Sequence, residues 1–349
     1  MQTLQQKLQS LLALHKIAGF SVAVTDLHNT IFAAGFGAES VERPEVGASA
    51  RSMYRIASVT KIVTGMTILR LCEQGKLELD RPVREYLPWL TFSRPEATAQ
   101  VTLRHLLSHT AGLPREYTPE GPREESALEQ TLREGLPSLE LATLPGDGVH
   151  LYSNWGIRLA SRVAEVVTGK PYTVLARNLV LDPLGMKRAT FDIREAITYP
   201  VSLPHEEDGE GNLRVYHRIK ENAARMAAGG LYADVEELCL LARCILNAGK
   251  NDAGEQVVAP ESIAEMCRAH AVSDPETGDA YGLTMRLHNY GGRVLCGHLG
   301  SAPPYAGSLW VDPESGFGVI TELNTQRDPL RFEIAEDIFS MLWSNGCLM

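Results

Sequence analysis

The sequence predicts an α+β fold in which both ends of the chain complete one antiparallel sheet. Short apolar runs bounded by turn residues lie near both ends, and helix signals with Pro and Gly punctuation fill the middle. No internal repeat divides the chain. We therefore expect a single domain over residues 1–349, flanked by helices. Its α/β part covers 1–60 and 230–349, and an inserted, mainly helical part covers 61–229.

The N-terminal elements are predicted from apolar periodicity. A helix is expected over residues 1–16, with leucines near one face at Leu4, Leu8, Leu11, Leu12 and Leu14. Two apolar runs, 20–26 and 30–37, predict strands joined by the turn Leu27-His28-Asn29. A helical run follows over 58–75 and ends near Gly75.

The middle of the chain contains two charged stretches without clear periodicity, residues 115–140 and 191–222. We expect both to be loops that shape the mouth of a cleft. The second contains the turn sequence HEEDGEGN. Between them, Pro171 fits the first turn of a helix.

After Gly229-Gly230 the pattern changes to a helix followed by short strands. The helix is expected over about 233–248. The expected strands are 281–288, 292–298, 305–312 and 316–324. Glycine-containing turns at 290–292 and 312–316 separate them. A terminal helix over about 329–344 closes the chain.

Composition excludes several classes of function. The 349 residues carry 33 Lys and Arg against 43 Asp and Glu, a formal net charge of -10 at pH 7. An acidic surface repels phosphates, so neither a nucleic acid nor a membrane is an expected partner. No apolar run is long enough to span a bilayer, and the N-terminus lacks a signal peptide's basic region, which predicts a cytoplasmic protein. The six cysteines form no C-x-x-C pair and are expected to be reduced and mostly buried.

A candidate nucleophile lies in the segment Arg55-Ile56-Ala57-Ser58-Val59-Thr60-Lys61. Ser58 and Lys61 are three residues apart at an expected helix start, so they share one helix face. The free N–H groups of a helix start stabilise developing negative charge. A lysine among apolar neighbours has a lowered pKa, which helps it to activate the serine. Taken alone, S-x-x-K is more often a capping serine beside a solvated lysine.

The segment Leu151-Tyr152-Ser153-Asn154-Trp155-Gly156 opens another helical stretch. A phenol beside a cationic lysine is a candidate general base or acid, because positive charge favours the phenolate. Asn154 offers hydrogen-bond donors and an acceptor to a substrate carbonyl group. The alternative is a buried tyrosine beside a capping asparagine.

A third segment, Gly297-His298-Leu299-Gly300-Ser301, lies on a predicted strand. Gly300 allows a substrate to approach the backbone closely. The N–H of Ser301 is a candidate partner for the N–H of Ser58 in an oxyanion hole. A lone histidine on a strand is usually structural.

Other site motifs are excluded. His105 and His109 have the spacing of zinc ligands, but Leu106 replaces the glutamate of H-E-x-x-H, and no third ligand is evident. The run Gly35-Phe36-Gly37 lacks the third glycine of a dinucleotide loop. Neither a P-loop nor G-x-S-x-G occurs. We therefore expect neither a metal nor an organic cofactor.

Taken together, the Ser58/Lys61, Tyr152/Asn154 and His298/Gly300 segments resemble the motifs of the serine β-lactamase and penicillin-binding protein superfamily. The sequences LRHLLSHTAGLP, PLGM and AGGLY extend the resemblance over about residues 10–343. The chain is most similar to the branch that holds class C β-lactamases, β-lactamase-like (family VIII) carboxylesterases, and D-specific aminopeptidases and carboxypeptidases. The resemblance implies a β-lactamase/transpeptidase-like fold.

The resemblance also implies roles for individual residues. Ser58 would be the acylated nucleophile, and Lys61 and Tyr152 would share the base and acid work. Asn154 would position the substrate carbonyl group, and His298 occupies the first position of the motif often written K-T-G. The backbone N–H groups of Ser58 and Ser301 would form the oxyanion hole.

Two departures from the family pattern favour an esterase. Histidine replaces the lysine that binds substrate carboxylates, and a partly neutral histidine does so less well near pH 7. The motif continues as SAPPYAG, in which Pro303 and Pro304 stiffen the chain. We expect a serine hydrolase that cleaves short-chain carboxylic esters through an acyl-enzyme on Ser58. Candidates for an apolar acyl or alcohol site are Tyr305, Trp155 and Trp310.

Two alternatives remain open. A D-amino-acid peptidase or weak β-lactamase would need a cation for a negatively charged substrate, and the candidates are Arg293 and Arg327. A catalytically idle scaffold or binding protein has no physical need of Ser58, Lys61 and Tyr152 together. The sequence indicates neither the natural substrate nor the oligomeric state.

Overall fold

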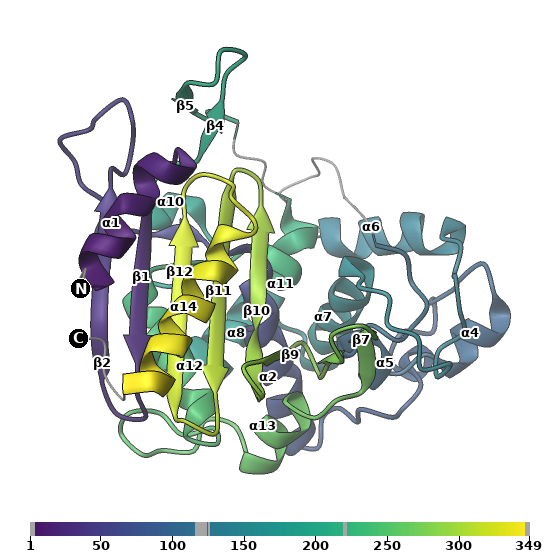
Figure 1. Cartoon of the computed structure of the whole chain (residues 1–349). Helices are drawn as coiled ribbons and strands as arrows, with labels where there is room; N and C mark the ends of the chain where they lie inside the picture. Colours follow the sequence, from purple (N-terminus) through teal and green to yellow (C-terminus); the bar gives the residue numbers. More distant parts are fainter. Residues whose placement is uncertain (1–3, 116–123, 125, 219–221, 346–349) are drawn as a thin grey trace.

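One large antiparallel sheet organises the chain. The computed structural model describes residues 4–115, 124, 126–218 and 222–345. The eight strands lie in the order β2-β1-β12-β11-β10-β9-β8-β7. They are β1 (Gly19–Thr25), β2 (Thr30–Gly37), β7 (Ala271–Asp274), β8 (Asp279–Tyr281), β9 (Arg286–Tyr290), β10 (Arg293–Ala302), β11 (Tyr305–Asp312) and β12 (Phe317–Leu323). Because β1 pairs directly with β12, the two ends of the chain complete one sheet, as predicted (Figure 1).

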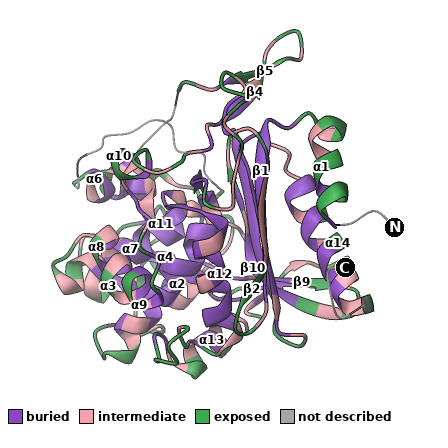
Figure 2. Cartoon of the chain, turned by 90° about the vertical axis from the view of Figure 1, so that its left-hand side faces the viewer, coloured by how far each residue is buried: buried purple, intermediate pink, exposed green. Residues whose placement is uncertain are grey.

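Helices cover both faces of this sheet (Figure 2). On one face, α1 (Leu4–His15) and α14 (Leu330–Asn345) form an apolar cluster with strand residues such as Trp310 and Val319. On the other face, α2 (Thr60–Glu73) and α12 (Val235–Leu246) pack against Leu309 and Ile320. Successive strand residues point to opposite faces, so the central strands β1, β10, β11 and β12 contribute to both clusters.

Most of the remaining elements form a group beside the sheet (Figure 1). The helices are α3 (Val83–Tyr86), α4 (Pro95–Gln100), α5 (Leu103–Leu107), α6 (Ala127–Gly135), α7 (Asn154–Thr168), α8 (Tyr172–Ala176), α9 (Asp182–Leu184), α10 (Ile193–Ala196), α11 (Met226–Gly229) and α13 (Pro260–Met266). Three 3-10 turns are η1 (Ala57–Val59), η2 (Leu136–Ser138) and η4 (Ala223–Arg225), and a π-helical segment, η3 (Arg177–Leu181), follows α8. Two small sheets pair β3 (Tyr54–Arg55) with β6 (Tyr232–Ala233), and β4 (His205–Glu207) with β5 (Leu213–Val215).

The two stretches predicted to be loops contain regular elements. Helix α6 occupies part of 115–140, because it buries Leu128 and Leu132 on one face despite its many charges. The stretch 191–222 contains α10 and the β4–β5 hairpin. The HEE of the predicted turn sequence HEEDGEGN forms β4, and DGEGN forms the turn of the hairpin. The loop prediction was therefore wrong for these parts. Residues 116–123, 125 and 219–221 of the two stretches lie outside the described residues.

Other boundaries also differ from prediction. The expected strand over 281–288 is broken, because Thr284 adopts a φ of +59° and its N–H donates to the carbonyl of Leu107. The sheet instead gains the unpredicted pair β7 and β8. Leu14 is 73% exposed and does not belong to the buried face of α1.

The cysteines are free thiols where the structure describes them. Cys239, Cys244 and Cys296 are buried, Cys72 and Cys267 are partly exposed, and Cys347 lies outside the described residues. Among the helices in the described part of the chain, none is both long and apolar enough to cross a bilayer.

Candidate active site

Ser58 lies where a short strand gives way to a long helix. Strand β3 ends at Arg55, η1 carries Ser58, and α2 begins at Thr60. Ala57 has a φ of +50°, in the left-handed region that residues with a side chain seldom adopt. Of residues 52–60, Ser58 alone is partly exposed, and the others are buried. The backbone therefore presents one hydroxyl group from a buried and tightly turned segment.

The structure brings three predicted side chains together at this hydroxyl. The ammonium group of Lys61 donates to Ser58 Oγ at 3.0 Å and to the Ala228 carbonyl oxygen at 2.6 Å. The phenol of Tyr152 also donates to Ser58 Oγ, at 3.0 Å. Two titratable groups thus lie within hydrogen-bond distance of one serine oxygen, and the deprotonated form of either can accept the Ser58 proton.

The electrostatics of the site favour proton transfer. Burial lowers the pKa of Lys61 below its ordinary 10.5, although the neighbouring phenol opposes this shift. For Tyr152, burial acts to raise the pKa, but the charge of Lys61 and hydrogen bonds with Lys61 and Ser58 outweigh it and hold the pKa below 10.0. A lowered phenol pKa makes the phenolate accessible closer to neutral pH, where a general base is most useful.

Tyr152 and Asn154 are held at the start of α7. Ser153 is the residue before the helix, and its hydroxyl donates to the carbonyl of Pro114 at 2.9 Å. Asn154 is the first residue of the helix and is partly exposed. Its contact with a substrate carbonyl group stays a prediction.

Strand β10 carries the third predicted motif beside the nucleophile. Its pairing with β9 ends at Gly297, and the strand continues alongside η1. A Cβ on Gly300 would clash with the carbonyl oxygen of Ile56, so the close approach of these backbones requires glycine. Ser301 follows at an exposed position. The pairing of its N–H with that of Ser58 as an oxyanion hole stays a prediction.

His298 is buried and faces Tyr281. Its Nε2 lies 2.9 Å from the Tyr281 hydroxyl oxygen, and its Nδ1 lies 2.6 Å from the Leu299 carbonyl oxygen. Burial, reinforced by the charges of Arg286 and Lys61, lowers its pKa well below 6.5. His298 is therefore a neutral imidazole with both nitrogens engaged. A direct catalytic role for it stays a prediction.

Side chains that the sequence analysis missed surround the ring of Tyr152. The guanidinium carbons of Arg115 and Arg286 each lie 5.7 Å from the ring centroid, and Lys61 Nζ lies 5.1 Å from it. The ring of His109 is 4.4 Å away, centroid to centroid. These residues come from separate segments, so no local spacing could reveal them. In the sequence, His109 stands out for its spacing from His105 and as part of the family resemblance, and neither signal indicates a contact with Tyr152.

Two of the three aromatic residues suggested for an apolar site lie elsewhere. Trp310 packs on the α14 face of the sheet, because alternation along β11 turns it away from Ser58. Trp155 is buried in the helical core. Both suggestions were therefore wrong. Tyr305 is also buried, and its hydroxyl donates to the Ser202 carbonyl oxygen at 2.7 Å.

The two cations suggested for a charged substrate are already paired. Arg293 forms an ion pair with Asp312 at 3.2 Å, and its guanidinium lies over the ring of Trp343. The suggestion of Arg293 was wrong, because it belongs to the α14 side of the sheet. Arg327 pairs with Glu207 and lines a cavity.

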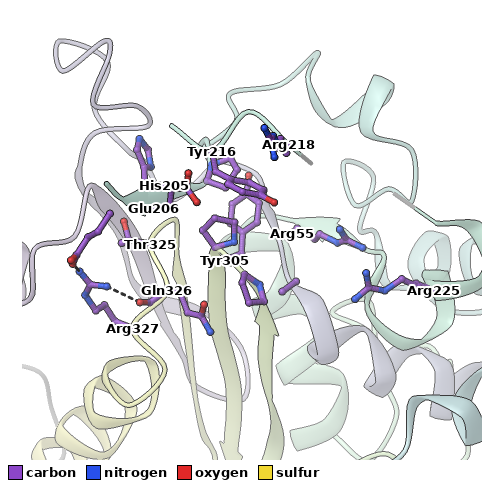
Figure 3. Close-up of a pocket in the computed structure, with 15 residues that line it drawn as sticks. Arg55, His205, Glu206, Tyr216, Arg218, Arg225, Tyr305, Thr325, Gln326 and Arg327 are labelled. Carbon is purple, nitrogen blue, oxygen red and sulfur yellow. Dashed lines mark hydrogen bonds and ion pairs between the residues drawn. The ribbon is translucent and has the colours of Figure 1, made fainter. Parts of the chain in front are cut away.

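This cavity, of about 450 Å³, adjoins the nucleophile segment (Figure 3). It is bordered by Arg55, three residues before Ser58, and by Ala302, the residue after Ser301. Its charged lining residues are Arg55, Arg218, Arg225, Arg327, Glu206 and Glu207. In Figure 3, Arg55 and Arg225 lie on one side of the cavity and Arg327 on the other, with Tyr305 between them.

Comparison with known proteins shows which family the sequence matches. A family model described as Beta-lactamase matches residues 4–340. Penicillin-binding protein 4 of Amycolatopsis lactamdurans is 25% identical over 335 residues, which cover 92% of this chain and 84% of that protein. Protein flp of Staphylococcus aureus (strain MW2) is 30% identical over 177 residues, half of this chain. The matched region covers only 35% of the length of protein flp.

Solved structures share the fold over nearly the whole chain. The octameric penicillin-binding protein homologue from Pyrococcus abyssi has a TM-score of 0.84 at 26% identity, covering 98% of this chain and 77% of its own. D-amino acid amidase from Ochrobactrum anthropi SV3 has a TM-score of 0.82 at 20% identity, covering 99% of each chain. EstCE1, a hydrolase with promiscuous acyltransferase activity, has a TM-score of 0.78 at 22% identity, covering 92% of this chain and 93% of its own.

Proposed function

The chain belongs to the Beta-lactamase family, and from this premise we propose that it hydrolyses short-chain carboxylic esters through an acyl-enzyme on Ser58. One observation carries the proposal: Lys61 Nζ and the Tyr152 hydroxyl each lie 3.0 Å from Ser58 Oγ. Structures with this fold include a β-lactamase, an amidase and a hydrolase with acyltransferase activity, so the fold supports acyl chemistry in general.

In the acylation step, the phenolate of Tyr152 accepts the proton of the Ser58 hydroxyl. Ser58 Oγ then bonds to the ester carbonyl carbon, and the carbonyl oxygen takes the negative charge. The N–H groups of Ser58 and Ser301 are the proposed donors to that oxyanion. When the tetrahedral adduct collapses, the C–O bond to the alcohol breaks, and the phenol of Tyr152 returns its proton to the departing alkoxide.

Deacylation repeats these steps with water in place of the serine hydroxyl. The phenolate of Tyr152 takes one proton from water, and the resulting hydroxide adds to the acyl carbon. Collapse of the second adduct releases the carboxylic acid and returns the proton to Ser58. Lys61 stays charged throughout and stabilises the phenolate, while Asn154 orients the acyl carbonyl group from the start of α7. An alcohol or amine in place of water would give acyl transfer.

The state of His298 favours neutral substrates. The family commonly has a lysine at this position, whereas His298 is buried, uncharged and engaged with Tyr281 and Leu299. The first position of the third motif therefore supplies no positive charge for a substrate carboxylate. A neutral ester needs none.

A second candidate substrate class carries a carboxylate, as a D-amino-acid peptide or a β-lactam does. Arg286 favours this class, because its guanidinium lies beside the ring of Tyr152 and its Nε is buried without a hydrogen-bond partner among the described residues. Such a guanidinium binds carboxylates in a paired geometry. Arg286 thus supplies, from β9, a cation that His298 does not.

Parallel turnover assays separate these candidates. The substrates are p-nitrophenyl butyrate, a D-Ala-D-Ala peptide and a chromogenic cephalosporin, with Ser58→Ala as the inactive control. We expect fast ester cleavage and little signal from the other two. Preferred cleavage of the peptide or the cephalosporin would overturn the ester assignment and support the second candidate. No turnover of any substrate would favour a scaffold or binding protein.

Substitution of Arg286 tests whether its guanidinium binds the carboxylate of a substrate. Arg286→Met removes the cation near Tyr152, and the matched control Arg293→Met removes a cation that is paired with Asp312. If carboxylate substrates use Arg286, their kcat/KM falls about 10- to 100-fold in Arg286→Met but not in the control. A general electrostatic effect on Tyr152 would instead lower the turnover of neutral esters equally.

A further inference from the structure

One residue holds the backbone on both sides of Tyr152. The N–H of Leu151 donates to the carbonyl oxygen of His109 at 2.8 Å. The N–H of Ser153 donates to Nδ1 of the same histidine at 3.2 Å. His109 thus accepts hydrogen bonds from the residue before Tyr152, through its main chain, and from the residue after Tyr152, through its side chain.

The backbone of His109 is shaped for this double contact. Its φ is +59°, in the left-handed region, directly after the turn that ends α5. Asparagine tolerates this conformation better than most residues with a side chain. The turn directs the imidazole back toward Tyr152, and the two rings lie 4.4 Å apart, centroid to centroid. The imidazole is buried.

The hydrogen bonds of His109 define its tautomer. Because the Ser153 N–H is a donor, Nδ1 of His109 must be an acceptor, which leaves the proton on Nε2. Nε2 lies 3.2 Å from the hydroxyl oxygen of Tyr281, so it donates there. The Tyr281 hydroxyl then donates to Nε2 of His298 at 2.9 Å. His298 Nδ1–H in turn donates to the carbonyl oxygen of Leu299 at 2.6 Å.

This chain of donors is consistent at every link and holds only while each member is neutral. Burial, with the charge of Lys61 adding to it, lowers the pKa of His109 well below 6.5. Burial likewise lowers the pKa of His298 and raises the pKa of Tyr281 well above 10.0. A proton on Nδ1 of His109 would deprive the Ser153 N–H of its acceptor. The neutral states therefore keep the direction of every hydrogen bond fixed.

We propose that His109 is a positioning residue for the phenol of Tyr152, and that Tyr281 and His298 fix the tautomer in which it acts. The inference rests on the proposed function, in which Tyr152 is the general base. His109 acts by setting where the phenol meets Ser58 Oγ and Lys61.

Alkaline titration of Tyr152 tests this inference without any substrate. Ultraviolet difference absorbance follows phenol ionisation, and Tyr152→Phe supplies the blank. The groups that face the phenol are Lys61 on α2, Arg286 on β9, Arg115, His109, Tyr281 and His298. A phenol that shifts away from Lys61 loses the charge that lowers its pKa, so its titration midpoint rises.

Two substitutions of His109 give opposite expectations. His109→Leu removes the acceptor for the Ser153 N–H, and we expect the Tyr152 midpoint to rise by about one pH unit and kcat/KM to fall about 100-fold. His109→Asn keeps an acceptor at the δ position and tolerates the left-handed φ. It is expected to restore the midpoint and most of kcat/KM. Tyr281→Phe removes the hydroxyl that fixes the tautomer and is expected to give a smaller shift in the same direction.

His105→Asn is the matched control. His105 caps α5 through Thr102, and its loss lowers thermal stability without touching the Tyr152 segment. Its Tyr152 midpoint should equal that of the wild type.

The outcomes are distinct. A folded His109→Leu variant with the wild-type midpoint would overturn the proposal, and so would equal shifts in His109→Leu and His109→Asn. If His109→Leu does not fold, Tyr281→Phe decides, and an unchanged midpoint in that variant overturns the proposal. If the wild type cleaves neither esters nor amides while the midpoints follow the expected pattern, the proposed function fails and the positioning role stands.

Discussion

Gly300 and Ile56 touch across the active site, where β10 meets the segment that carries the nucleophile. A Cβ on Gly300 would clash with the carbonyl oxygen of Ile56 and lie 3.5 Å from the Cβ of Ala57. The segment that Gly300 meets leads directly into Ser58. The relative placement of Ser58 and Ser301 therefore depends on a contact that only glycine permits.

The first prediction concerns this contact. Gly300→Ala must push β10 away from η1, because the obstructing atom is a backbone oxygen. We expect a loss of about 1–3 kcal/mol in the free energy of unfolding and a fall in kcat/KM of about 100-fold. Urea denaturation and ester turnover measure the two effects. Gly209→Ala, in the turn between β4 and β5, is the control, since nothing lies within 4 Å of the added Cβ there. Equal behaviour of the two variants would refute the account of Gly300.

The second prediction concerns the charge of Lys61. Burial lowers the pKa of this lysine below 10.5, and the charge of Lys61 in turn helps to lower the pKa of Tyr152 below 10.0. The folded state therefore binds both protons less tightly than the unfolded chain does. The free energy of unfolding of the wild type, relative to Lys61→Met, should rise with pH through the lowered pKa values and level off above 10.5.

Urea denaturation of both proteins between pH 7 and pH 10 measures this difference. A difference that stays flat or falls with rising pH would contradict the assignment of lowered pKa values to the pair. The same variant should lose about 10²- to 10⁴-fold in kcat, because Tyr152 is the general base and its phenolate loses the charge that stabilises it.

A third prediction concerns Glu322, a buried carboxylic acid on β12. Both of its side-chain oxygens lack a hydrogen-bond partner within the described part of the chain. Burial raises its pKa well above 4.5, with only partial opposition from Arg331. The folded state thus holds this proton more tightly than the unfolded chain does. The wild type should be most stable relative to Glu322→Gln below pH 4.5, and it should lose that advantage as the pH rises through the raised pKa.

Urea denaturation at pH 5 and pH 8 tests the sign. We expect the free energy of unfolding of Glu322→Gln, relative to that of the wild type, to be higher at pH 8 than at pH 5. The exposed Glu276, in the turn between β7 and β8, provides the control Glu276→Gln. If the wild type instead becomes more stable relative to Glu322→Gln as the pH rises, the carboxylate is ionised in the folded state.

The sequence predicts the sheet well because alternation and turn residues are local signals. Apolar runs at both ends of the chain predicted one sheet completed by both ends, and the pairing of β1 with β12 confirms it. Helix α6 was missed because charges obscure its narrow apolar face, which Leu128 and Leu132 provide. Strands β7 and β8 are too short to carry a periodic signal of their own.

The candidate site likewise contains residues that a local pattern predicts and residues that only tertiary folding brings together. Ser58 and Lys61 are three residues apart, so their spacing predicts that they are neighbours, and the family resemblance implies their roles. His109, Tyr281 and Arg286 reach Tyr152 only through tertiary folding, and no local pattern marks them. The misplacement of Trp310 has a related cause, because a residue's face on a strand depends on register with its neighbours.

Labelling of Ser58 tests the central claim most directly. A fluorophosphonate reacts with an activated serine hydroxyl whatever the natural substrate is, and intact-protein mass spectrometry followed by peptide mapping locates the adduct. We expect one adduct per chain, on Ser58, with labelling lost in Ser58→Ala and strongly slowed in Tyr152→Phe and Lys61→Met. Labelling of another residue, or a wild type that reacts no faster than Ser58→Ala, would contradict the claim that Ser58 is the nucleophile.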